Sequence, residues 1–238
     1  MNGVHVICYH RVLPIVSGDP ASVDYYHSRR RILHSLGDFR RQLDEIRRGC
    51  EVLDARGFVA RRHGSVGGRP AILLTFDDGY ADFRDVILPE LMARGLPSVL
   101  FPTKAPVVSC HVPPADRVYA LLAAAASSGR PLPERELESW VSGEAKEAML
   151  RASPREQDEM LARLAVSAGS VRPAAAPVHV DEAWLRSLPA DVYLGAHGLF
   201  HHEFGSLPPE SLKSELTEIL SWVASIRPGQ SAGVWLAY

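Results

Sequence analysis

The 238-residue sequence has few cysteines, little net charge and no long apolar run, and each shortage excludes a class of protein. Its three cysteines, Cys8, Cys50 and Cys110, are widely spaced and form no C-x-x-C pair. We therefore expect reduced thiols rather than a disulfide framework or a zinc ribbon. Lys and Arg total 26 against 28 Asp and Glu, and the longest basic run is residues 29–31. This charge balance predicts no nucleic-acid partner.

The apolar segments are too short to act in a membrane. No run of about 18 apolar residues occurs, which excludes a membrane-spanning helix. The first apolar run is too short for a secretory signal and has no basic residues before it. These features predict a cytoplasmic protein.

What is present is an alternation of β-rich and helical patterns, over a length that suits one domain. The sequence predicts strands at residues 4–10, 71–76, 97–103, 192–197 and 232–238. It predicts amphipathic helices at residues 38–48, at 80–94 with Gly95 as the stop, and from 208 or 209 to 226. Strands that alternate with helices indicate an α/β fold with a largely parallel sheet.

The alternation stops between residues 105 and 189, where the sequence becomes rich in alanine. Helix propensity predicts a helical insert of about four short helices there. The simplest role for such a segment is a packing cap or lid without chemistry. The last stretch, residues 232–238, has the apolar character of an interior strand.

Two adjacent carboxylates, Asp77 and Asp78, follow the apolar strand at 71–76. The carboxyl ends of parallel strands are where α/β folds place their ligands. Gly79 can adopt a backbone conformation closed to other residues, so the chain can turn sharply there. An acidic turn and a cation site are both consistent with this pair.

Two histidines, His197 and His201, follow the strand predicted at 192–197. Their spacing of four allows the imidazoles to converge, although surface or capping roles also fit. With one carboxylate of the Asp pair, they would complete a three-ligand site for an ion such as Zn²⁺, which would neutralise the crowded carboxylates. The other carboxylate could then take a proton from water whose pKa the ion lowers towards about 7.

These motifs resemble, as an ordered set, those of the polysaccharide deacetylases, the NodB-homology family of carbohydrate esterases. The resemblance lies in ICYHRVLP (7–14), LLTFDDGY (73–80) with the following DFRDVILPEL (82–91), and GAHGLFHHEFGSL (195–207). It implies that Asp77 is the general base and that Asp78, His197 and His201 bind a divalent metal, with Zn²⁺ as the first candidate. It also implies a distorted (β/α) barrel of the polysaccharide deacetylase type and hydrolysis of acetyl groups on sugars.

The resemblance covers only the first two thirds of such a domain. In the family, a further strand ends in a Pro-Tyr motif, and a late Leu-x-His supplies the general acid. Residues 232–238 look like the start of that strand, so residues 1–238 are expected to form a single, C-terminally incomplete domain with the 105–189 insert. A truncated product, a barrel edge completed by a second copy of the chain, and a protein with little turnover all remain open.

Three further residues are candidates for substrate binding. His10 resembles a histidine that lines the barrel mouth in relatives, where it could replace the missing acid; the alternative is a buried histidine bonded to backbone. Tyr80 could stack on a sugar, although packing is the commoner role. Tyr238 stands where the family uses backbone near the oxyanion.

The leading functional prediction is a metal-dependent hydrolase that removes the N-acetyl group from a sugar in a bacterial surface polysaccharide, such as an O-antigen, or in its precursor. The expected partner is therefore an N-acetylated saccharide. The rival is a carbohydrate-binding or scaffold protein that retains the metal site with little or no catalysis.

Overall fold

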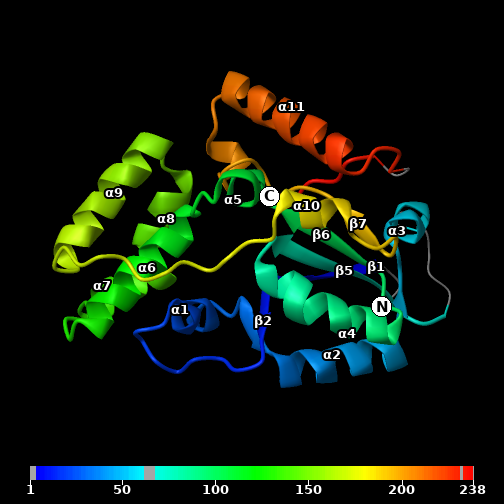
Figure 1. Cartoon of the computed structure of the whole chain (residues 1–238), viewed down its shortest axis with the longest axis horizontal. Coiled ribbons are helices and arrows are strands. Elements are labelled where there is room, and N and C mark those ends of the chain that lie inside the picture. Colours follow the sequence, from blue (N-terminus) through cyan, green and yellow to red (C-terminus); the bar gives the residue numbers. More distant parts are fainter. Residues whose placement is uncertain (1–3, 62–67, 231–232, 238) are drawn as a thin grey trace.

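A computed structural model describes residues 4–61, 68–230 and 233–237, and its centre is a parallel sheet (Figure 1). The sheet has the order β1-β5-β6-β7, with β4 paired to the start of β5. Its strands are β1 (Val4–Tyr9), β4 (Glu51–Val52), β5 (Ala71–Asp78), β6 (Ser98–Pro102) and β7 (Val192–Leu194). A second, two-stranded parallel sheet pairs β2 (Arg11–Leu13) with β3 (Leu33–Ser35). The predicted α/β fold with a parallel sheet is confirmed.

The central strand β5 is mostly apolar before its terminal aspartates because both of its faces are buried. Successive side chains on a strand point to opposite faces. Ile72, Leu74 and Phe76 belong to the main core with the surrounding helices. Leu73 instead packs with Val99 and Phe101 of β6 in a separate cluster.

Helices pack against the sheet and enclose the main core (Figure 1). They are α2 (Leu36–Gly49), η1 (Phe83–Ile87), α4 (Leu88–Arg94), α10 (Glu182–Arg186) and α11 (Pro209–Ile226), and a short helix, α3 (Ala55–Arg61), follows β4. Gly95 ends α4 in a left-handed conformation, as the sequence predicts. The helix predicted at 80–94 begins with the π-helical turn η1, since Pro89 has no N–H to donate to the preceding turn.

The stretch between β6 and β7 is mostly helical. Its helices before α10 are α5 (Lys104–Ser109), α6 (Pro114–Ser127), α7 (Glu134–Val141), α8 (Glu144–Arg151) and α9 (Pro154–Ser167). In Figure 1, α6 to α9 lie beside the sheet rather than over it, next to α1 (Val23–Arg29). These helices bury a second core of their own, which includes Tyr119 and Leu164.

Buried polar groups join the helical cluster to the sheet. His27 of α1 lies 2.8 Å from Asp116 of α6 through Nε2 and Oδ1, and both side chains are almost fully buried. Tyr80, just after β5, donates its hydroxyl to the same Asp116 carboxylate. Arg11 of β2 pairs with Asp24 of α1 at 2.6 Å and lies 3.5 Å from Asp82. Charged groups in this joint are therefore paired rather than isolated, as burial requires.

The stretch predicted as a final strand, residues 232–238, is not a strand in its described part. Between 233 and 237 it contributes one parallel bridge, Ala196 to Leu236. The reason is that β7 has only three residues, so it offers little regular edge on which a further strand could pair. Within the described ranges no pairing joins β7 to β1, and closure into a barrel is not seen.

No helix in the described part of the chain has the length and apolar character needed to cross a membrane.

Candidate metal centre

The aspartate pair ends β5, at the carboxyl edge of the sheet. Asp77 and Asp78 pair with Phe101 and Pro102 of β6. Asp78 and Gly79 both have positive φ, 69° and 79°. A Cβ on Gly79 would lie 2.7 Å from the Cβ of Pro102, so only glycine fits this turn. The turn makes the two neighbouring carboxylates face different groups.

The two histidines lie on a loop after β7 that several backbone hydrogen bonds hold. His197 donates its N–H to the carbonyl of Pro102 at 3.0 Å, which extends the pairing of β6 with β7. The first N–H groups of α5, from Lys104 and Ala105, donate to the carbonyls of Gly198 and Leu199. The strand end and the helix start thus fix the loop against the aspartate pair.

Asp78, His197 and His201 converge on one point. Oδ1 of Asp78 lies 3.0 Å from Nε2 of His201 and 3.5 Å from Nε2 of His197. One possible ligand atom from each residue lies within 4.8 Å of the other two. A tetrahedral zinc site with its usual bond lengths separates nitrogen and oxygen ligands by about 3.3 Å. The spacing therefore fits a single divalent ion with small adjustments.

The imidazole of His197 is oriented by the backbone. Its Nδ1 lies 2.9 Å from the carbonyl oxygen of Ala237. A carbonyl only accepts hydrogen bonds, so Nδ1 carries the proton and Nε2, on the side of Asp78, keeps its lone pair. Metal-binding histidines commonly have such a partner on the other ring nitrogen.

The electrostatics of Asp78 also fit a cation. The residue is 5% exposed, and its Oδ1 makes no hydrogen bond of good geometry, although Nε2 of His201 lies 3.0 Å away. Burial opposes ionisation of this carboxyl, but the imidazoles of His201 and His197 outweigh it, and the pKa of Asp78 lies well below its usual value. The same carboxylate raises the pKa of His201 against the opposing effect of burial. A buried, ionised oxygen without a hydrogen bond of good geometry favours a bound cation.

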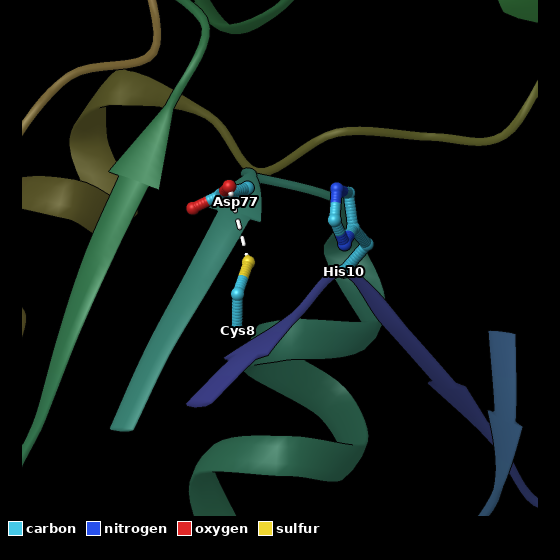
Figure 2. Close-up of side chains that lie close together, drawn as sticks. All are labelled: Cys8, His10 and Asp77. Atoms are coloured by element: carbon cyan, nitrogen blue, oxygen red, sulfur yellow. Dashed lines mark hydrogen bonds between the residues drawn. The ribbon is translucent and has the colours of Figure 1, made fainter. Parts of the chain in front are cut away.

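Asp77 faces a second group of side chains, Cys8 and His10 (Figure 2). The thiol of Cys8 donates to Oδ2 of Asp77, with a sulfur–oxygen distance of 3.2 Å. Cys8 is exposed as a residue, yet partial desolvation of the thiol and the neighbouring carboxylate raise its pKa to about 12. The other oxygen of Asp77, Oδ1, is buried and has no hydrogen-bond partner.

Of the two aromatic candidates, only Tyr80 lies in the described part of the chain. Tyr80 is 4% exposed, and its ring is stacked on His179 with the guanidinium of Arg11 near its face. Its prediction as a sugar-stacking residue is wrong, because the ring and hydroxyl are used in the buried joint to the helical cluster. Tyr238 lies outside the described residues.

The sequence analysis did not identify Glu215, which binds the loop that carries His197 and His201. This buried carboxylate of α11 accepts the N–H of Leu199 at 2.7 Å and lies 3.6 Å from Nδ1 of His202. Gly198, at φ 81°, leaves room for it. Glu215 lies four residues before the buried Ile219, so a lone acid on the apolar stripe of this helix was the available signal.

A pocket opens beside the histidines. Its volume is about 220 Å³, and its lining includes His197, His201 and Phe204 together with Glu147 and Leu150 of α8. A small polar group of a ligand can therefore reach the imidazoles from the side of the helical cluster.

No family model and no curated protein matches the sequence. Solved structures do match in fold. IcaB from Ammonifex degensii has a TM-score of 0.53 at 16% identity, covering 95% of this chain and 70% of its own. A de-N-acetylase from Aggregatibacter actinomycetemcomitans has a TM-score of 0.50 at 14% identity, with coverage of 94% and 74%.

A polysaccharide deacetylase from Bacillus cereus has a TM-score of 0.52 at 11% identity. The match covers 99% of this chain and 50% of the Bacillus protein. These likenesses are in fold, and the chain has the NodB-like fold of the polysaccharide deacetylases.

Proposed function

We propose that the protein is a divalent-metal hydrolase that removes the N-acetyl group from a sugar of a bacterial surface polysaccharide or its precursor. The observation that carries the proposal is the convergence of Asp78, His197 and His201 on one point, next to a second carboxylate with a free buried oxygen. The deacetylase fold supports the same reading.

In this proposal Asp78, His197 and His201 hold the ion. Zn²⁺ is the first candidate for a site of two imidazoles and one carboxylate. The bound ion supplies Lewis-acid polarisation of the acetyl carbonyl and lowers the pKa of water. The Nδ1 contact to Ala237 keeps the coordinating nitrogen of His197 free of its proton. The loop bonds from β6 and α5 keep both imidazoles in place.

Asp77 is the proposed general base. Its unpartnered Oδ1 can accept a proton from the attacking water, since the thiol of Cys8 occupies only Oδ2. His10, beside Asp77, is proposed to contact the sugar and is the nearby group able to return a proton to the leaving amine. The pocket along α8 would receive part of the saccharide.

The test is acetate release from N-acetylated oligosaccharides by the metal-loaded protein. Asp77→Asn should lower the rate by about 10²- to 10⁴-fold, because it removes the general base, while the variant keeps its metal. Asp85→Asn is the matched control, since Asp85 is exposed and pairs with its neighbour Arg84. Metal-loaded wild type that releases no acetate from any such substrate would contradict the proposal.

A further inference from the structure

We propose that Cys8, His10 and Asp77 form a second cation site, for a thiophilic divalent ion such as Zn²⁺ or Cd²⁺. The site lies beside the Asp78 triad, and an ion bound there occupies Asp77. Binding at this site stands on its own geometry. Its consequence, inhibition by excess metal, rests on the proposed function, in which Asp77 is the base.

The three side chains have the spacing that such an ion needs. One ligand atom from each lies within 4.8 Å of the others, and the closest pair, Sγ of Cys8 and Oδ2 of Asp77, is 3.2 Å apart. With usual zinc bond lengths, tetrahedral geometry separates a sulfur from an oxygen or nitrogen ligand by about 3.5 Å. Figure 2 shows the thiol directed at the carboxylate, with the imidazole of His10 on the same side of the strand ends.

Rigid elements hold these residues. Cys8 and Asp77 belong to the adjacent parallel strands β1 and β5, in a register that pairs Cys8 with Thr75. His10 follows β1 directly, at the junction with β2. The sheet backbone fixes the distance between thiol and carboxylate, so the site does not depend on ordering a loop.

The charges of the three groups suit a divalent ion. When the ion binds, a sulfur–metal bond replaces the S–H bond of Cys8, and the thiol proton leaves to solvent. Thiolate and carboxylate together carry two negative charges, which a divalent ion neutralises, and His10 binds as neutral imidazole. Oδ1 of Asp77, buried without a partner, gives the carboxylate a further unused acceptor.

The sulfur ligand separates this site from the first. Thiolates select Zn²⁺ and related soft ions over Mg²⁺ and Mn²⁺, whereas the Asp78 triad contains only oxygen and nitrogen ligands. Cys8 is exposed, so an ion can reach it from solvent. Excess Zn²⁺ or Cd²⁺ should therefore fill the second site after the first and compete with the catalytic use of Asp77.

The experiment is a Cd²⁺ titration of the full chain carrying Cys50→Ser and Cys110→Ser, followed by the thiolate-to-cadmium charge-transfer absorption. Cys8 is then the sole cysteine. Because the first site fills first, the band should grow over the second equivalent of Cd²⁺ per chain; it should vanish on adding Cys8→Ser. On adding Asp78→Ala it should persist and saturate at one equivalent. Loss of a group that merely supports a ligand typically lowers metal affinity by about 10- to 100-fold. His10→Ala should therefore raise the Cd²⁺ concentration at which the band is half-saturated by at least about tenfold. His5→Ala, an exposed histidine of the same strand, is the matched control.

Each result of these measurements either supports or overturns the second site. Absence of the band in the protein with Cys8 alone, or a band unaffected by His10→Ala, overturns the second site. A band that is lost in Asp78→Ala would make Cys8 a ligand of the first centre, and this result also overturns the second site. Excess Zn²⁺ should inhibit acetate release less in Cys8→Ser than in wild type, each relative to its own activity at one equivalent. A Cys8-dependent band in a protein that releases no acetate leaves the second site standing and removes only the proposed function.

Discussion

Asp77 and Asp78 are neighbours in sequence, yet they belong to two groups of side chains with different surroundings. Asp78 is buried and meets two imidazoles from a loop more than one hundred residues later in the sequence. Asp77 is less buried and meets the thiol of Cys8 in the first strand and the imidazole of His10 just after it. The positive φ of Asp78 turns the chain between them and so divides one acidic pair into two sites.

The neighbouring side chains and the degree of burial together determine what each carboxylate can do. The buried Asp78 is ionised without a hydrogen bond of good geometry on Oδ1, a state that a cation stabilises. Asp77 has a donor on one oxygen and a free lone pair on the other, which suits proton transfer. Variants that affect one group and spare the other test this division.

The largest expected effect is on metal binding. Asp78→Ala removes the only carboxylate among the three converging ligands, and we expect the first ion to bind more than about 100-fold more weakly. Cys8→Ala should leave binding of the first equivalent unchanged. Equilibrium dialysis with Zn²⁺ measures both, and equal losses in the two variants would contradict the division into two groups.

Gly79→Ala should disturb both groups of side chains, because the positions of Asp77 and Asp78 depend on this turn. A methyl group would overlap Pro102, and alanine is strained at φ 79°, so unfolding free energy should fall by about 1–3 kcal/mol. The first metal should also bind more weakly. Gly68→Ala, also at positive φ but with open space around a Cβ, controls for strain alone. Denaturant unfolding of metal-free protein gives the comparison.

Glu215→Gln acts on the histidine group alone. It weakens a charge-assisted hydrogen bond to the N–H of Leu199, and we expect a loss of about 1–3 kcal/mol in unfolding free energy. The exposed Glu218 on the same helix pairs with Lys104, and Glu218→Gln should cost less than about 1 kcal/mol. Chemical denaturation separates the two, and an equal cost would argue against a supporting role for Glu215.

The smallest expected effect is the pH dependence of the metal-free protein. The raised pKa of His201 adds stability below about pH 6.5 that is lost as pH rises through the folded-state pKa. The lowered pKa of Asp78 adds stability above about pH 3.8 that is lost as pH falls. Their attraction should therefore contribute most between these values. His201→Asn should flatten the fall above pH 6.5, as measured by unfolding in the presence of a chelator.

Much of the fold was predictable because its signals are local. The apolar run at 71–76, the stripe of α2 and the glycine that ends α4 each depend on a few neighbouring residues. The last strand was predicted wrongly in its described part, because a strand also needs a regular partner edge, and β7 provides only three residues. A local apolar pattern says nothing about that edge.

The sequence by itself determined which groups could do chemistry: two adjacent acids after a strand, two histidines four residues apart, and a glycine that permits the turn. Only the tertiary structure decided how they are divided. It turned Asp78 towards the histidines and Asp77 towards Cys8, placed Glu215 under the loop, and withdrew Tyr80 into the joint with Asp116. These choices depend on contacts between residues far apart in the chain, and a single sequence carries no record of which distant groups will meet.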